Sequence, residues 1–304
     1  MAQNSDPLWP LFAPLWTELR AVSPGLLLAG GYALFLKQQW LISQSHLNLG
    51  NHVAPFISIE RWLDPTPRAT NDLDFVVGVE IIASRGEQQS FDAALKKHGF
   101  RVVPENRLWQ FSKAISAETE LKIDFHAAPP SSDRADVRVE ARRVKPNPSL
   151  AQLGIHGREN AEAAGCEWHP FRFEIDHVEI AIPNAVTLSV MKLVAALEKR
   201  LKSLEARRSP AERNILEAES HKHARDVFRV IAMLTREEND LVPQIVARFR
   251  PMSSFRNAAN AFHLMFVSDE QWAAPIVASQ WQPADYELIR NLLAQWLSHA
   301  ESQS

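Results

Sequence analysis

Two carboxylates placed two residues apart are the strongest chemical signal in this sequence. Asp72 and Asp74 flank Leu73 and run into the apolar residues 75–77, so the segment predicts a β-strand that begins after a polar turn. Residues two apart on a strand point to the same face of the sheet, and two carboxylates there repel each other unless a cation lies between them. Oxygen ligands at this spacing are typical of Mg²⁺ or Mn²⁺ sites, in which substrate phosphates complete the coordination shell.

A third carboxylate lies on a later segment with strand periodicity. In residues 120–126 apolar side chains alternate with polar ones, so Asp124 and His126 share one face. We expect Asp124 to be a third metal ligand that also helps to activate an acceptor. Histidine is equally common as a hydrogen-bonded structural residue, and we assign no catalytic role to His126, His221 or His223.

Two adjacent glycines, Gly30 and Gly31, interrupt an apolar run just before a helical pattern. Without β-carbons the chain can turn sharply, and backbone N–H groups at the start of a helix can approach a phosphate closely. A glycine pair alone is more typical of a plain turn. Together with the aspartates, it predicts a phosphate-binding turn.

In this order the glycine pair, the segment 68–74 and Asp124 resemble the nucleotidyltransferase fold of the DNA polymerase β superfamily. The closer resemblance is to the AbiEii-type nucleotidyltransferases found as bacterial toxins. It covers roughly residues 25–235. The glycines and the aspartates are about forty residues apart, more than is usual in the superfamily, so residues 41–67 are expected to be an insertion.

The resemblance implies a set of site residues at the matching positions of this chain. Asp72, Asp74 and Asp124 would be catalytic metal ligands, and Asp226 a further active-site carboxylate. Six residues would bind the nucleotide: Gly30, Gly31, Arg68, Thr70, Lys192 and Lys222. By spacing alone, Lys222 and Asp226 lie one helical turn apart, and such pairs are usually weak surface contacts. The resemblance favours the active-site role.

The pattern of elements predicts an α+β fold, with a nucleotidyltransferase-like mixed sheet, flanking helices and a C-terminal helical domain. Strand periods dominate up to Pro183, where helical spacing takes over. We therefore expect a nucleotidyltransferase domain at 1–182, with the insertion at 41–67, and a helical domain at 183–304.

Composition and charge restrict the class of protein. The 304-residue chain is 46% hydrophobic and 23% charged, as expected for a globular protein of one large or two ordinary domains. Its formal charge of -3 disfavours a generally basic nucleic-acid-binding surface. A local basic cluster predicts either a solvated loop or a groove wall for an RNA backbone. Its members are Arg134, Arg138, Arg142, Arg143 and Lys145.

Cysteine content and apolar runs bear on the compartment. The single cysteine, Cys166, has no partner for an internal disulfide and lacks the companion spacing of a zinc site. The first residues lack a basic start and an apolar core, and no run of about 18 apolar residues follows. We expect a cytoplasmic protein that does not associate with membranes.

The leading functional hypothesis is metal-dependent nucleotidyl transfer from a nucleoside triphosphate to an acceptor hydroxyl. The resemblance implies an RNA acceptor, such as tRNA, and a cognate antitoxin in a toxin-antitoxin or phage-defence setting. Small hydroxylated molecules and proteins stay open as acceptors. The alternative is a catalytically silent nucleotide-binding or scaffold protein of the same fold, against which the acidic cluster counts. A hydrolase or nuclease would use the same carboxylates, but the sequence offers no recognisable water-activating base.

Overall fold

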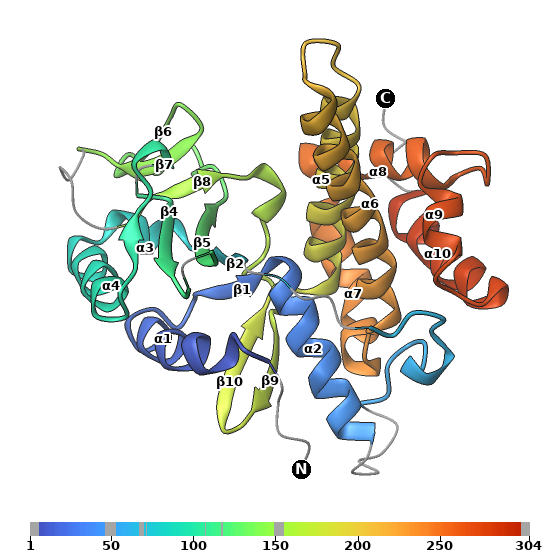
Figure 1. The fold of residues 1–304 in the computed structure, drawn as a ribbon, viewed down its shortest axis with the longest axis horizontal. Coiled ribbons are helices and arrows are strands. Elements are labelled where there is room, and N and C mark those ends of the chain that lie inside the picture. The colour runs from blue at the N-terminus through green and yellow to red at the C-terminus, as the bar shows by residue number, and fades with distance from the viewer. Residues whose placement is uncertain are drawn as a thin grey trace. The chain divides into compact units, whose positions relative to one another are not determined.

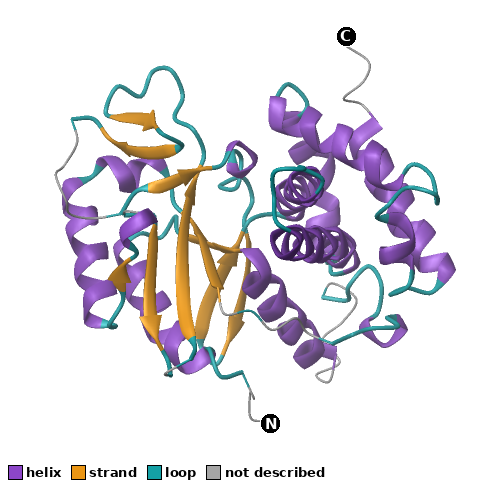
Figure 2. Cartoon of the chain, turned by 45° about the horizontal axis from the view of Figure 1, so that its top comes forward, coloured by secondary structure: helices purple, strands orange, loops and turns teal. Residues whose placement is uncertain are grey.

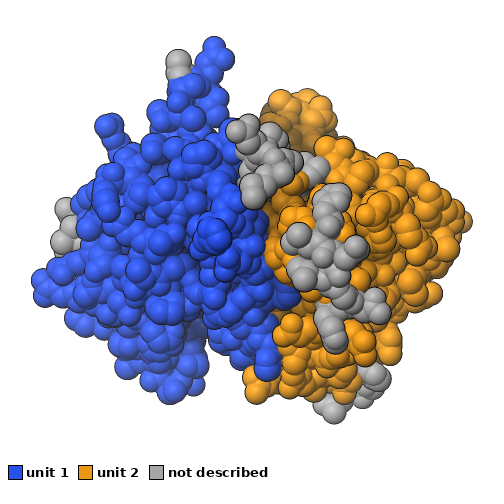
Figure 3. Space-filling model, turned by 90° about the horizontal axis from the view of Figure 1, so that it is seen from below, with its two compact units in different colours: residues 1–33, 68–183 blue, residues 34–67, 184–304 orange. Residues whose placement is uncertain are grey.

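The chain divides into two compact units in a computed structural model. That structure describes residues 6–45, 53–66, 70, 72–106, 108–116, 118–148 and 155–298. Unit 1 comprises residues 1–33 and 68–183, and unit 2 comprises residues 34–67 and 184–304 (Figure 3). The expected α+β class is confirmed, because a mixed sheet flanked by helices is combined with a C-terminal helical region.

Unit 1 is built around a mixed eight-stranded sheet (Figure 1). Its strands are β1 (Leu27–Ala29), β2 (Asp72–Val76), β3 (Arg101–Val102), β4 (Gln110–Ala114), β5 (Glu120–Ala127), β6 (Val137–Glu140), β7 (Arg143–Pro146) and β8 (Gly157–Glu159). The order along the main path is β1-β2-β5-β8-β7-β6, and β3 joins through β4, which pairs with β5. One edge of β5 pairs in parallel with β2. The other edge pairs first with β4 and then, at its last residues, with β8.

Helices and a second, two-stranded sheet complete unit 1 (Figure 2). They are α1 (Trp9–Val22), α3 (Val79–Ala83), α4 (Arg85–Lys97), the 3-10 turns η2 (Pro104–Asn106) and η3 (Ala161–Ala163), and the strands β9 (Phe171–Ile175) and β10 (Val178–Ile182). Positive φ at Asp176 (47°) and His177 (65°) turns β9 back into β10, as in tight hairpins. Trp16 Nε1 donates to the Glu179 backbone oxygen at 2.8 Å and fastens this hairpin to α1.

One face of β2 and β5 forms the core of unit 1. Buried apolar residues alternate with more exposed polar ones along β5, which is the predicted half-buried pattern, and the aspartates of β2 are likewise more exposed than Leu73 and Phe75. The ring centroids of Phe75 and Phe125 are 5.6 Å apart on the buried face. Trp16 of α1 lies 5.8 Å from Phe75, and Phe91 of α4 lies 6.2 Å from Phe125. The aspartates of these strands therefore point away from the core.

The basic cluster predicted at 134–145 lies on the β6–β7 hairpin and its approach. Arg134 contacts Asp136 at 2.9 Å, and the buried Lys145 contacts Glu140 at 2.8 Å. These carboxylates neutralise part of the cluster. Such pairing favours the solvated hairpin over a groove for an RNA backbone.

Unit 2 is helical. Its elements are η1 (Ile59–Arg61), α5 (Ala185–Ser203), α6 (Pro210–Ala232), α7 (Arg236–Phe249), α8 (Ser253–Phe266), α9 (Ala274–Ala278), α10 (Pro283–Leu297) and the part of α2 (Gly30–Ser45) that follows Ala33. Among helices of the described residues, none combines the length and apolar character needed to cross a membrane.

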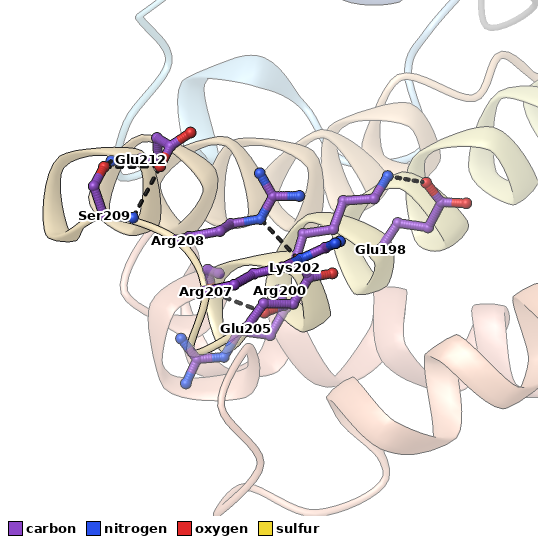
Figure 4. Close-up of polar contacts among 9 residues, drawn as sticks. Glu198, Arg200, Lys202, Glu205, Arg207, Arg208, Ser209 and Glu212 are labelled. Atoms are coloured by element: carbon purple, nitrogen blue, oxygen red, sulfur yellow. Dashed lines mark hydrogen bonds and ion pairs between the residues drawn. The ribbon is translucent and has the colours of Figure 1, made fainter.

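Charged residues shape the connection between α5 and α6 (Figure 4). The Ser209 hydroxyl accepts from the Glu212 N–H at 3.3 Å, and the Glu212 carboxylate accepts from the Ser209 N–H at 2.8 Å. This capping box starts α6. In the preceding turn, the Glu205 carboxylate accepts hydrogen bonds from Arg207 and Arg208 at 2.9 and 3.0 Å.

Residues 53–66 pack against the helices of unit 2. The N–H groups of Phe56 and Ile57 donate to the carbonyls of Leu234 and Ala232, at 2.7 and 3.0 Å. Ala232 is the last residue of α6, where carbonyls lack intrahelical partners, and Leu234 follows just beyond the helix. The segment 34–67 thus clusters with the helices, whereas its residues 41–67 were expected to be an insertion in the first domain.

Candidate metal centre

Asp74 and Asp124 are direct neighbours across two parallel strands. The register of β2 and β5 places Asp74 opposite Asp124. Residues in register point to the same face of a sheet, so both carboxylates project from the polar face. A slip of one residue would turn them into the core, and the aromatic residues on the other face oppose such a slip. The core packing of unit 1 therefore decides this pairing.

His126 joins the two carboxylates. Its Nε2 lies 3.2 Å from Asp74 Oδ1, two residues beyond Asp124 on β5. One ligand atom from each of the three side chains lies within 4.8 Å of the others, a group that could hold a metal ion. The sequence pattern alone assigns His126 no role. The two-residue spacing from Asp124 was the sequence signal that could have pointed to His126 as a ligand. That Asp74 lies opposite Asp124, and so near His126, depends on the fold.

Gln110 of β4 holds Asp124 from the other edge of β5. The two residues are opposite each other, and Gln110 Nε2 donates to Asp124 Oδ1 at 2.7 Å. Asn106 Nδ2 in turn donates to Gln110 Oε1 at 2.8 Å. Burial raises the pKa of Asp124 above its ordinary value and the charge of Asp74 adds to this, while the Gln110 hydrogen bond and nearby positive charges oppose it. A bound cation would relieve this unfavourable negative charge.

Gly30 leaves room for the Asp74 carboxylate. Ala29, at the end of β1, lies opposite Asp74, and Gly30 follows with φ of +70° as α2 begins. A β-carbon built on Gly30 would lie 1.8 Å from Asp74 Oδ2. Both the backbone conformation and the space thus require glycine here. Gly31 is buried in the first turn of α2, and phosphate binding by this pair stays a prediction.

Asp72 is not a member of the metal-binding group found among the described residues. It is exposed at the first position of β2, where the register places it opposite Lys122, one pleat away from Asp124. Its N–H donates to Thr70 Oγ1 at 3.2 Å, so Thr70 shapes the turn that starts the strand. Arg68 lies outside the described residues. The metal role of Asp72 and the nucleotide-binding roles of Thr70 and Arg68 stay predictions.

In unit 2, Lys192 of α5 and Asp226 of α6 form a buried ion pair. The Nζ and Oδ2 atoms are 2.8 Å apart, and the side chains are only 6% and 3% exposed. Lys222 is half-buried on α6, one turn before Asp226. Two buried charges in contact support each other, and removing either leaves the other uncompensated. The nucleotide-binding roles of Lys192 and Lys222 and the catalytic role of Asp226 stay predictions.

Two carboxylates and one imidazole form a donor set for a divalent cation. Mg²⁺ prefers oxygen ligands, and an imidazole nitrogen shifts the preference toward Mn²⁺ or a later transition metal. Asp74, Asp124 and His126 thus fit the predicted divalent cation. The imidazole adds a preference for Mn²⁺ or a later transition metal over Mg²⁺, which oxygen ligands alone would not give.

Comparisons with protein-family models, with curated proteins and with solved structures found no match. Function is therefore inferred from the chemistry of this group and from the sequence patterns around it.

Proposed function

We propose that this protein transfers a nucleotidyl group from a nucleoside triphosphate to an acceptor hydroxyl, as its resemblance to AbiEii-type nucleotidyltransferases implies. The observation that carries the proposal is the parallel register that sets Asp74 opposite Asp124, with His126 beside them. The Gly30 turn lies against the same carboxylate. A cation held by so few protein ligands keeps open positions, which triphosphate oxygens commonly fill.

Asp74, Asp124 and His126 are the residues that would hold the cation. When bound, a divalent cation would neutralise the triphosphate and align the attacking and leaving oxygens. Because of the imidazole ligand, we expect Mn²⁺ to bind more tightly than Mg²⁺.

Asp124 is the proton acceptor in this proposal. The acceptor oxygen bonds to the α-phosphorus, the bond from that phosphorus to the bridging oxygen breaks, and pyrophosphate leaves with the electron pair. The hydroxyl proton passes to Asp124. Its carboxylate projects from the same face as Asp74, so it can take a proton from a hydroxyl that binds beside the cation. Gln110 donates to Oδ1 and so holds the orientation of the carboxylate.

RNA is the first acceptor to test, because the resemblance implies a nucleic acid, and a cognate antitoxin would then restrain the activity. Lys192, Lys222 and Asp226 belong to unit 2, and their proposed contacts with the nucleotide rest on the resemblance alone. Growth arrest on expression, relieved by a neighbouring gene product, would support the toxin role.

Labelling tests the reaction directly. Purified protein is incubated with Mg²⁺ or Mn²⁺, each α-³²P-labelled nucleoside triphosphate in turn, and total bacterial RNA. Asp74→Asn, Asp124→Asn and Asp72→Ala are compared with Asp176→Asn, a control in an exposed turn at a positive φ that asparagine tolerates. We expect label in RNA with the wild type and the control only.

Full labelling by Asp74→Asn would contradict the proposal. Triphosphate binding that depends on metal, without label in RNA, would point to a small-molecule or protein acceptor. Binding with no turnover on any acceptor would favour the catalytically silent alternative.

A further inference from the structure

Arg158 lies beside the candidate metal centre, on the strand next to β5. The register of β5 and β8 places Arg158 opposite His126. In-register residues share a face, and His126 shares its face with Asp124, so the Arg158 side chain belongs to the polar face that carries the carboxylates. The sequence patterns had not singled out this residue.

The backbone around Arg158 is held close to β5. A β-carbon on the preceding residue, Gly157, would lie 2.2 Å from the Ala127 β-carbon, so glycine is what allows β8 to approach. The N–H of His156 donates to the Leu108 carbonyl at 2.6 Å. Arg158 therefore extends from a closely packed strand and not from a loose loop.

Trp109 supports the guanidinium. On one edge of β5, β4 pairs with residues 120–124 and β8 pairs with residues 126–127. Trp109 lies between these two pairings, where its carbonyl accepts a hydrogen bond from the Phe125 N–H at 2.8 Å. The Arg158 guanidinium carbon is 5.4 Å from the Trp109 ring centroid, a cation–π contact. Such stacking restrains the arginine and leaves the N–H edge of its plane available.

Arg158 forms no ion pair with any residue that the structure describes. Its side chain is exposed, and no described carboxylate lies within the 4.0 Å of an ion pair. It is nevertheless close enough to Asp124 to lower the pKa of that carboxyl, against the larger effect of burial. Once a divalent cation balances Asp74 and Asp124, the extra positive charge of Arg158 would attract an anion.

We propose that Arg158, supported by Trp109, binds a phosphate group of the substrate beside the metal centre. This inference rests on the proposed nucleotidyl transfer and adds a specific residue to it. A planar guanidinium with five donors matches two phosphate oxygens at once, which a lysine cannot do. The phosphate belongs either to the triphosphate or to the backbone of a nucleic-acid acceptor.

Two binding probes distinguish the triphosphate from the nucleic-acid backbone. They are inorganic tripolyphosphate and a single-stranded RNA oligonucleotide, each with MnCl₂. The variants are Arg158→Gln, Arg158→Lys and Trp109→Leu, each checked for thermal unfolding. Arg172→Gln is the matched control, because this exposed strand arginine of unit 1 is already paired with Glu179 at 2.8 Å. Mn²⁺ binding without phosphate is measured in parallel.

We expect Arg158→Gln to weaken tripolyphosphate binding about 10- to 100-fold, the size of a lost charged hydrogen-bonded contact. Arg158→Lys should recover part of the affinity, and Trp109→Leu should lose less than Arg158→Gln. Mn²⁺ alone should bind Arg158→Gln at least as tightly as the wild type, because a nearby positive charge has been removed. Weaker binding of RNA alone would assign Arg158 to the acceptor backbone.

Unchanged affinity for both probes in Arg158→Gln would overturn the inference and leave the nucleotidyl-transfer proposal standing. A wild type that binds neither probe would overturn it as well. A wild type that binds tripolyphosphate through Arg158 but transfers no nucleotide would instead contradict the proposed reaction alone.

Discussion

Gly30 and Asp74 are in such close contact that only glycine fits at position 30. A β-carbon there would lie 1.8 Å from Asp74 Oδ2, far closer than two heavy atoms that are not bonded to each other can approach. The glycine therefore does more than turn the chain from β1 into α2. It leaves the space in which the Asp74 carboxylate faces Asp124.

Gly30→Ala should lower the free energy of unfolding and also displace the carboxylate. The positive φ alone costs an alanine about 1–3 kcal/mol, and the overlap with Asp74 adds to it. We expect Mn²⁺ affinity to fall in the fraction that remains folded, measured by titration calorimetry. Gly86→Ala, where a β-carbon meets nothing within 4 Å, should bind Mn²⁺ like the wild type. Equal behaviour of the two variants would show that Gly30 does not position Asp74.

His126→Asn should change metal preference. The substitution replaces an imidazole nitrogen with an amide oxygen, so Mn²⁺ affinity should fall about tenfold or more while Mg²⁺ affinity falls less. His98→Asn is the control, since His98 contacts Glu18 on the helical side of unit 1, 3.0 Å away. Titration of each protein with both ions measures the effect. An equal loss for both ions would mean that His126 is not a ligand.

Asp124→Asn should stabilise the metal-free protein at neutral pH. Burial raises the folded-state pKa of this carboxyl above 3.8, so its ionised form costs stability in the fold. The cost is absent below pH 3.8, where the carboxyl is protonated in both states, and it is complete above the raised folded-state pKa. The amide oxygen still accepts from Gln110. We expect a gain of about 1 kcal/mol at pH 7 that disappears in acid, together with lost Mn²⁺ binding.

Chemical unfolding of wild type and Asp124→Asn between pH 3 and pH 8 is the measurement. Asp176→Asn, in the exposed β9–β10 turn, should follow the wild type. If the free energy of unfolding of Asp124→Asn followed the same pH dependence as that of the wild type, burial of the Asp124 charge would not be unfavourable.

Asp226→Ala should strongly destabilise unit 2. It leaves the Lys192 ammonium buried without its partner, which costs about 3–5 kcal/mol. Glu219→Ala is a matched control between the same two helices, because the ion pair of Glu219 with Lys199 is about one-third exposed on each side. Its loss should cost about 1 kcal/mol or less. Similar unfolding midpoints for the two variants would contradict this prediction.

A double variant, Lys192→Met with Asp226→Leu, separates stability from activity. Replacing both charges with apolar side chains should restore much of the stability. Normal nucleotidyl transfer by this folded variant would show that the pair is structural, whereas inactivity would support the active-site roles that the resemblance implies.

Local spacing in the sequence was enough for several of the strands and helices and for part of the site. The apolar and polar pattern predicted the strands that the structure shows as β2 and β5, and the change to helical spacing after Pro183 predicted the helices that follow it. The same period of two put Asp124 and His126 on one face. These periods follow from backbone dihedral angles and from burial of one face, which short segments already determine.

Only the tertiary structure decided which polar residues meet. Asp74 and Asp124 lie fifty residues apart in the chain, and the packing of Phe75 and Phe125 with rings from α1 and α4 sets the register that makes them neighbours. The contact of His126 with Asp74 and the position of Arg158 opposite His126 follow from that register. Spacing along the chain determines which face a side chain occupies. Its partner across strands is decided by the packing of distant segments.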